Sequence, residues 1–514
     1  MVSHQRTQRQ EQISGWSQEH LSKANIGIIG SGNGAQAVAA YCAGLGVGAL
    51  TLVDTARAGS GILIPPGECQ PSEETIMTLQ NRLREMNPDI TVDTHCRAPL
   101  NPRHEKEALS LCDVIVDTVC DPGWTSRAFR TAIDSNRTLL YLQLKGTDSE
   151  GSLNGYLVGN RTSVSQMDAI TELTSREETR STGHSSLDAV IQGAMATDRI
   201  RSAVMPLSTM GECSERPSAW PELSAERKQS YLDPAIYENH DDNTYNEHIR
   251  IPSEMNIPTR MIRRRKKKAL VIGAGGIGTQ VTIALSSQYH HDVSPKVVHI
   301  ADPDHVSFSN IHRMTWYTED DASTSRNKAK VLAEQLMRHN PDIRAKGIPK
   351  AINGDSGKML SKKYDYIFIC LDNPEHKRDI VSYLVQSGHD GIMTYGTVGP
   401  FNAEMGAYQK GKGPCPNCQN DNFTDSIDAH KTRATSCSDV GLQNIVMMNA
   451  LVGGCMVDTA YRIAAGIYIP GGERLRLSSQ EPRFGMHLIP HEAPNMPSHG
   501  CPCRGYMARG RIYR

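Results

Sequence analysis

The sequence predicts an α/β fold with two similar domains, each a mostly parallel β-sheet with flanking helices. At two places, 24–35 and 268–278, an apolar run opens into a glycine-rich turn, and the same succession of helices and strands follows each turn. Strands that alternate with helices form parallel sheets that are covered on both faces. With 514 residues, the chain is long enough for two or three domains that each have a core.

The first half of the chain has the pattern of a βαβ unit followed by a further helix and strand. The run 24–30 predicts a strand, 36–45 a helix, and 49–54 a second strand that ends in Asp54. An amphipathic helix at 77–88, which ends in Asn-Pro, precedes a strand at 113–117.

The second half repeats this order of elements. Strands are predicted at 268–272, 297–302 and 365–370, and helices at 279–288 and 328–341, the last of which again ends in Asn-Pro. Because the whole order recurs, the chain contains a long internal repeat and not only a recurring motif.

The repeat sets the expected domain boundaries. A first domain should span 1–207 and a second 268–514, with 208–267 as a linker or insertion because it is rich in Pro, Glu, Ser and Asn. The basic run 263–268 is either a solvated lead-in to the second sheet or a docking patch for an acidic partner.

Composition narrows the class of protein. Lys and Arg number 55 against 56 Asp and Glu, which argues against a nucleic-acid binder because phosphate contacts need a basic surplus. Without an apolar run that could span a membrane or act as a secretory signal, we expect a soluble, cytoplasmic protein. Thirteen Cys, an odd number, favour metal ligands or nucleophiles over a disulfide scaffold.

The glycine-rich turn of the second half, with Gly273, Gly275, Gly276 and Gly278, is typical of a Rossmann-like phosphate site. It lets the backbone approach a phosphate at the N-terminus of a helix. Asp302, at the end of the next strand, is placed to accept hydrogen bonds from a ribose. These features alone equally suit an NAD- or FAD-dependent oxidoreductase or a non-catalytic nucleotide-binding scaffold.

Polar and cationic residues that follow Asp302 favour a polyphosphate ligand. Asn310, Arg313 and Lys328 come soon after it in the chain. Arg can fork onto two phosphate oxygens, and Lys acts as a point charge. Hydride transfer does not need this set, so the cluster favours chemistry at a nucleoside triphosphate.

The segment from Lys268 to Pro341, together with Asp372-Asn373, resembles the adenylating domain of the ThiF/MoeB and ubiquitin-activating enzyme (E1-like) family. The shared pattern is GxGGxG, then Asp-x-Asp-x-Val-x-x-Ser-Asn-x-x-Arg, a Lys that opens the next helix, Asn-Pro at its end, and a later Asp-Asn. Met314 stands where the family has Gln.

The resemblance implies a role for each matching residue. Asp302 would hold the ribose of ATP, Asn310, Arg313 and Lys328 the triphosphate, and Asp372 a Mg²⁺ near the α-phosphate. The four glycines, Asp304 and Asn373 complete the implied ATP site. A carboxylate that attacks the α-phosphorus brings negative groups together, so cations and metal must offset the developing charge.

The first half keeps the scaffold but lacks this cluster. The same spacing counted from Asp54 arrives at Ile62 and Pro65 in place of Asn310 and Arg313. We therefore expect no ATP turnover in the first half, which resembles the fused inactive and active halves of eukaryotic ubiquitin-activating enzymes.

Arg9 lies in an N-terminal segment, Arg6-Thr-Gln-Arg9-Gln10, that is similar to the family's Arg-x-x-Arg-Gln entry segment. The resemblance implies that Arg9 is an arginine finger that reaches the triphosphate. The alternative is a solvated arginine in a polar tail.

Cys415-Pro-Asn-Cys418 has the spacing of half a tetrahedral zinc site, and Cys501-Pro-Cys503 offers the second half. Family members with zinc use two CxxC pairs, so the CxC departs from their pattern and His499 is an alternative ligand. Four protein ligands leave no open position, so we expect a structural Zn²⁺. Unligated thiols are the alternative.

Cys437 lies in a polar segment that resembles the family's crossover loop. In several members, a Thr-x-Cys-x-x-x-Gly-Val pattern there supplies the cysteine that attacks the acyl-adenylate. Here the cationic side chains of His430, Lys431 and Arg433 lie close by in sequence and would lower the pKa of a thiol. The resemblance implies a thioester on Cys437; the alternative is a cysteine kept without catalytic use.

Together, these observations predict a compact, bacterial-type E1-like enzyme. It would adenylate the C-terminal carboxylate of a ubiquitin-like or sulfur-carrier protein with Mg-ATP and then form a thioester on Cys437. We expect an E2-like conjugating enzyme as a further partner, and neither nucleic acid nor a membrane. The alternatives are an adenylating tailoring enzyme that acts on a ribosomally made peptide and, more distantly, the oxidoreductase or the non-catalytic scaffold.

Overall fold

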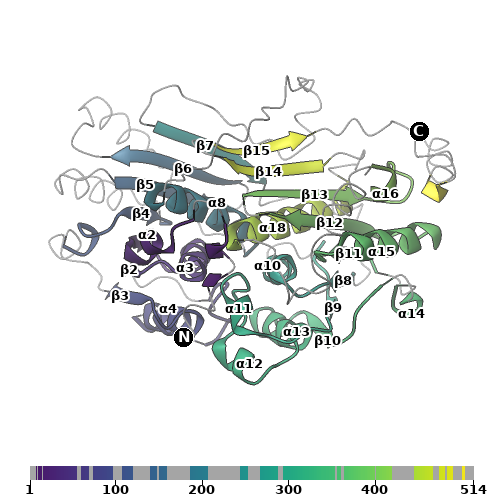
Figure 1. The fold of residues 1–514 in the computed structure, drawn as a ribbon, viewed down its shortest axis with the longest axis horizontal. Coiled ribbons are helices and arrows are strands. Elements are labelled where there is room, and N and C mark those ends of the chain that lie inside the picture. Colours follow the sequence, from purple (N-terminus) through teal and green to yellow (C-terminus); the bar gives the residue numbers. More distant parts are fainter. Residues whose placement is uncertain are drawn as a thin grey trace. The chain divides into compact units, whose positions relative to one another are not determined.

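The computed structural model divides the chain into two compact units, Met1–Met255 and Asn256–Arg514, and each is described by itself (Figure 1). The structure describes residues 7–8, 10–13, 16–54, 60–68, 73–96, 107–119, 139–146, 150–158, 186–205, 244–252, 267–287, 293–353, 356–360, 364–399, 401–419, 445–466, 474–480, 483–489 and 501–503.

The first unit is built on a seven-stranded sheet of order β3-β2-β1-β4-β5-β6-β7. The strands from β3 to β5 pair in parallel, and β6 and β7 continue the sheet antiparallel. The strands are β1 (Asn25–Ile29), β2 (Ala49–Asp54), β3 (Thr91–Cys96), β4 (Val114–Asp117), β5 (Leu139–Gly146), β6 (Glu150–Val158) and β7 (Thr244–Pro252). The helices are α2 (Gln18–Lys23), α3 (Asn33–Leu45), α4 (Glu73–Met86) and α8 (Ser186–Val204).

The second unit is built on an eight-stranded sheet of order β10-β9-β8-β11-β12-β13-β14-β15, parallel from β10 to β12 and antiparallel beyond. Its strands are β8 (Lys268–Ile272), β9 (Val297–Ala301), β10 (Arg344–Ile348), β11 (Tyr366–Ile369), β12 (Ile392–Val398), β13 (Asn402–Tyr408), β14 (Arg474–Gln480) and β15 (Arg483–Ile489). Its helices are α10 (Gly276–Leu285), α11 (Phe308–Ile311), α12 (Glu319–Ser323), α13 (Lys328–His339), α14 (Gly357–Leu360), α15 (Pro374–Gln386), α16 (Pro416–Gln419) and α18 (Val446–Ala464).

The predicted fold class is confirmed, and the internal repeat extends to helix packing. In each unit the helix after the glycine turn packs against a long helix that comes later in the chain, α3 against α8 and α10 against α18. A Cβ at Gly193 would lie 2.6 Å from Ala37, and a Cβ at Gly453 would lie 2.7 Å from Gln280. Glycine thus permits the same close helix crossing twice.

The segment 208–267, expected to be a linker or insertion, contains the strand β7. This strand pairs antiparallel with β6, so the structure places 244–252 in the sheet of the first unit. Its sequence mixes apolar and polar residues, because an outer antiparallel strand needs only one apolar face. Across the described ranges, no helix has both the length and the apolar character needed to cross a membrane.

Candidate functional site

The glycine-rich turn joins β8 to α10. Gly273 has a φ of +96°, which favours glycine, and a Cβ there would lie 2.7 Å from the carbonyl oxygen of Cys370. Gly275 is the N-cap of α10 and provides no side-chain cap. The N–H groups of the first turn of α10 therefore face a position suited to an anion.

Asp302 ties the end of β9 to this turn. Its side chain is 7% exposed and accepts hydrogen bonds from the backbone N–H groups of Ala274 (2.6 Å) and Asp304 (2.8 Å). Burial raises the pKa of the Asp302 carboxyl, while the Lys328 ammonium and the two N–H groups oppose that rise. The carboxylate is thus held rigidly at the carboxyl edge of the sheet, where ligands of such sheets bind.

Lys328 is the first residue of α13, and Asn327 is the helix N-cap. The Asn327 amide donates to the carbonyl oxygens of Asp302 (3.1 Å) and Asp304 (2.9 Å). The Lys328 ammonium, 8% exposed, lies 3.0 Å from the Asp304 carboxylate. The structure therefore joins Asp302, Asp304 and Lys328 to the glycine turn through one continuous set of contacts.

Tyr317 is a member of this set that the sequence did not indicate. It is fully buried, and its hydroxyl lies 2.8 Å from the carbonyl oxygen of Ala274, to which it donates, and 3.3 Å from that of Lys328. Tyr317 ends a run of buried residues that begins at Asn310, so in sequence it looks like an ordinary core position.

Asn310 and Arg313 lie at α11 and the turn that follows it. Both are buried; the Asn310 amide donates to the Ser307 hydroxyl (2.5 Å), and the Arg313 guanidinium donates to the Ser309 carbonyl oxygen (3.0 Å). Met314, next in the chain, has its Cε 3.8 Å from the Cβ position of Gly275. This contact places the α11 turn beside the glycine turn.

The loop after β11 reaches the glycine turn from the other side. In addition to the Cys370 oxygen, a Leu371 methyl lies 3.2 Å from the Cβ position of Gly273. Asp372 is exposed. The Asn373 side-chain oxygen accepts hydrogen bonds from two backbone N–H groups of α15, at 2.8 and 3.1 Å, so this residue serves as the helix cap.

In the first unit, Gln36 links the equivalent turn to the segment that follows Asp54. The Ser31 hydroxyl donates to the Asp54 carboxylate. Gln36, in α3, donates to the Ser31 carbonyl oxygen (2.9 Å) and accepts from the Leu63 N–H (2.9 Å). Ile62 and its two successors are buried. An apolar segment therefore follows Asp54 where the second unit has Asn310 and Arg313.

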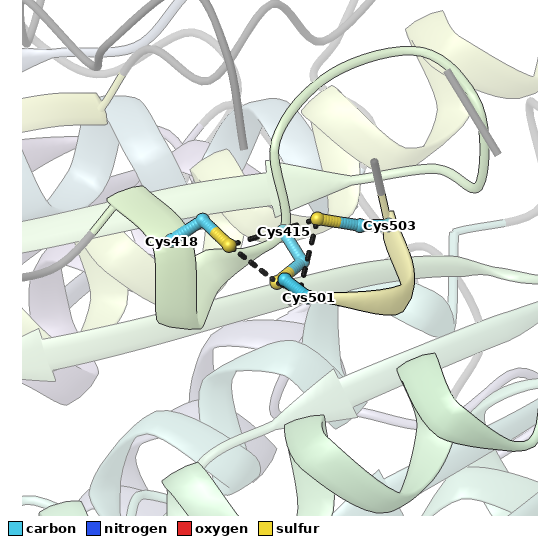
Figure 2. Close-up of side chains that lie close together, drawn as sticks. All are labelled: Cys415, Cys418, Cys501 and Cys503. Atoms are coloured by element: carbon cyan, nitrogen blue, oxygen red, sulfur yellow. Dashed lines mark hydrogen bonds between the residues drawn. The ribbon is translucent and has the colours of Figure 1, made fainter. Parts of the chain in front are cut away.

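The four cysteines of the expected metal site lie together (Figure 2). Cys415 Sγ lies 3.6 Å from the sulfurs of Cys418 and Cys501, Cys418 Sγ lies 3.6 Å from that of Cys503, and the sulfurs of Cys501 and Cys503 are 3.2 Å apart. A tetrahedral Zn²⁺ with Zn–S bonds of about 2.3 Å needs sulfurs about 3.8 Å apart. The CxC spacing therefore supplies two ligands, and the donor set fits zinc.

This cysteine cluster is part of the second unit's core. Cys415 and Cys503 pack in one buried cluster with residues of β8, β11, β12 and α15. Asn417 in α16 donates to the Ser382 hydroxyl of α15 at 2.7 Å. A metal at this place would fix Cys501–Cys503 to the sheet.

Several residues singled out in the sequence lie outside the described residues. They are Arg9, His499 and Cys437, together with the cationic neighbours of Cys437, which are His430, Lys431 and Arg433. Their assigned roles stay predictions.

A family model described as "ThiF family" matches residues 4–149 and 245–502. The chain is 27% identical over 224 residues to "Adenylyltransferase and sulfurtransferase UBA4" of Meyerozyma guilliermondii, covering 42% of this chain and 48% of the relative. It is 25% identical over 210 residues to "Sulfur carrier protein ThiS adenylyltransferase" of Escherichia coli, covering 41% of this chain and 76% of the relative. The chain thus spans about half the length of the first relative.

Solved structures give a weaker likeness. E. coli MccB is 19% identical and matches with a TM-score of 0.37 over 46% of this chain and 65% of its own. PaaA is 18% identical, with a TM-score of 0.36 over 44% of this chain and 73% of its own. At these scores, the two structures carry no argument about substrates.

Proposed function

This chain belongs to the ThiF family, and we propose that it is an ATP-dependent adenylyltransferase that activates the C-terminal carboxylate of a small carrier protein, ubiquitin-like or sulfur-carrying. The observation that carries the proposal is the joined set of Asp302, Asp304 and Lys328 at the glycine turn. The relatives named for adenylyl transfer to sulfur carriers support the choice of substrate class.

The residues present fit the chemistry. The first turn of α10 offers N–H groups to phosphate, and Asp302 keeps lone pairs for the ribose hydroxyls. The Lys328 ammonium, now paired with Asp304, would turn its charge to the triphosphate. A carboxylate oxygen of the carrier attacks the α-phosphorus, the bond to the bridging oxygen breaks, and pyrophosphate leaves. Arg313 and Lys328 offset the charge that gathers during this step.

Magnesium would be held by Asp372. This side chain is exposed on the loop whose residues Cys370 and Leu371 touch Gly273. When bound, Mg²⁺ supplies positive charge to the departing pyrophosphate. Arg9 is proposed as a further cation for the triphosphate, because its segment is similar to the family's Arg-x-x-Arg-Gln entry segment.

Zinc is proposed for Cys415, Cys418, Cys501 and Cys503, because their sulfurs all lie within 4.8 Å of one another. When bound, it supplies a cross-link between distant parts of the chain and no chemistry at the substrate.

We propose a second step in which the Cys437 thiolate attacks the acyl carbonyl and AMP leaves, giving a thioester that an E2-like enzyme would accept. Cys437→Ala should then keep pyrophosphate exchange, because adenylation precedes the thiol. It should form no carrier conjugate that thiols can cleave. Intact mass spectrometry with and without dithiothreitol measures this, and an undiminished conjugate would remove Cys437 from the mechanism.

The two units should respond differently to matched substitutions. Asp302→Asn should raise the KM for ATP by about 10- to 100-fold, because it removes charge-assisted hydrogen bonds to the ribose. Asp54→Asn, at the equivalent place in the first unit, should leave that KM unchanged in protein that is folded by circular dichroism. Equal losses in both variants would contradict the assignment of ATP chemistry to the second unit.

The proposed function is tested by exchange of labelled pyrophosphate into ATP. We expect exchange that depends on a carrier protein with a C-terminal Gly and is absent without it. Exchange that depends on a short ribosomally made peptide instead would favour the tailoring enzyme. Tightly bound NAD or FAD, with no exchange under any condition, would favour an oxidoreductase.

A further inference from the structure

Lys377, in the first turns of α15, is a buried lysine that no part of the proposed function uses. Its side chain is 0% exposed, and its ammonium donates a hydrogen bond of 2.8 Å to the carbonyl oxygen of Gly396 on β12. This lysine occupies a core position in α15. The other buried residues of the helix are Ile380, Val381, Leu384 and Val385.

The ammonium lies at the carboxyl ends of two central strands. Gly396 follows Tyr395, which pairs with Ile369, the last residue of β11. The next residue after Ile369 is Cys370, whose carbonyl oxygen faces the glycine turn at Gly273. Lys377 therefore connects the α15 end of the loop 370–373 to β12, while the other end of that loop packs on the candidate phosphate site.

The charged and ionisable groups near Lys377 come from two parts of the chain. They are Asp372 and Cys370 in the loop after β11, and Glu404 on β13. Burial lowers the pKa of Lys377 to about 8, and the Asp372 charge opposes that shift. Lys377 and Asp372 thus interact electrostatically.

Burying an ammonium group destabilises the fold. Removing a charge from water costs several kcal/mol, and replacing buried ionic groups by apolar side chains of similar volume is often neutral or stabilising. Met has a similar length and would fill the same core position. Stability alone therefore gives no reason for a lysine here.

We propose that Lys377 is a positioning residue for Asp372 and holds the loop 370–373 against the glycine turn. The proposal rests on the proposed function, because it assigns to Asp372 the metal that accompanies ATP. Through its bond to Gly396 the ammonium ties the start of α15 to β12, and with it the loop that carries Asp372. Lys377 itself touches neither ATP nor metal.

The test is the magnesium dependence of nucleotide binding, measured by calorimetry with a non-hydrolysable ATP analogue in Mg²⁺ and in EDTA. Lys377→Met should weaken binding in Mg²⁺ by about tenfold or more, the loss expected when one partner of a buried charged contact is removed. Binding in EDTA should stay as in the wild type, in protein that is folded by circular dichroism. Lys377→Arg should recover part of the Mg²⁺-dependent affinity.

Lys330→Met, which removes an exposed lysine of α13, is the matched control and should behave as the wild type. If Lys377→Met weakens binding equally in Mg²⁺ and EDTA, or keeps the wild-type dependence on Mg²⁺, the positioning role is wrong. A wild-type protein that binds no ATP analogue at all would instead overturn the proposed function, so the two failures are distinguishable.

Discussion

Lys328→Ala should reduce the rate of pyrophosphate exchange by about 10²- to 10³-fold, the range found when one preorganised group that stabilises transition-state charge is removed. Lys328 is held at the start of α13 by the cap at Asn327 and by the ion pair with Asp304. When ATP binds, we expect only the ammonium to turn from Asp304 to the phosphates, while the start of the helix stays in place. The measurement is exchange at saturating ATP and carrier, with the KM for ATP determined in parallel.

Lys330→Ala is the control for this prediction. Lys330 lies two residues further along α13 and is exposed, so its loss changes the helix charge equally but not the site. The variant should exchange at the wild-type rate. A Lys328→Ala protein that exchanges as fast as Lys330→Ala would show that the contact with Asp304 is structural only.

Loss of the metal should strongly lower the stability of the folded protein. The purified protein should hold about one equivalent of zinc per chain. Removing it with a strong chelator, or replacing Cys415 by Ser, should lower the melting temperature by about 10 °C or more, because structural zinc contributes folding free energy outright. Cys415 and Cys503 also belong to the buried core, so releasing them loosens β12 and α15.

Two variants separate the metal from the thiols. Cys418→His keeps a zinc ligand and should retain metal and most of the stability. Cys112→Ala, in the first unit, should leave the zinc content unchanged. A folded Cys415→Ser protein that melts at the wild-type temperature, or a wild-type protein without zinc, would refute the assignment.

Much of the second unit could be predicted because its elements have strong local signals. β8, β9 and β11 are short apolar runs, and α13 has a polar cap and an apolar stripe. The helix α10 begins at Gly276 and not near 279, because the later glycines of the turn already belong to its first turn. Such end effects depend on tertiary packing more than on propensity.

Other elements have no comparable signal. α8 is rich in Ala and is buried on nearly all sides, so it lacks the polar face that reveals an amphipathic helix. The outer strands β13 to β15 contain Gly, Arg and Ser and are identified by their antiparallel partners. Their existence follows from pairing across the sheet, which one sequence does not display.

The residues of the candidate site could be predicted from the sequence, but the contacts between them could not. The spacing of Asp302, Arg313 and Lys328 pointed to a nucleotide site, but the pairing of Lys328 with Asp304 comes from the meeting of two loops. Tyr317 had no distinguishing signal. Lys377 did have one: it stands three and four residues before Ile380 and Val381, at core spacing in α15.

The central claim is that the second unit joins a carrier carboxylate to AMP. Incubating the protein with Mg-ATP and a carrier that ends in Gly, then measuring the intact mass of the carrier, tests it most directly. We predict a carrier whose mass is increased by one adenylyl group, absent with Lys328→Ala and in EDTA. An unchanged carrier together with release of ADP and phosphate would contradict the claim.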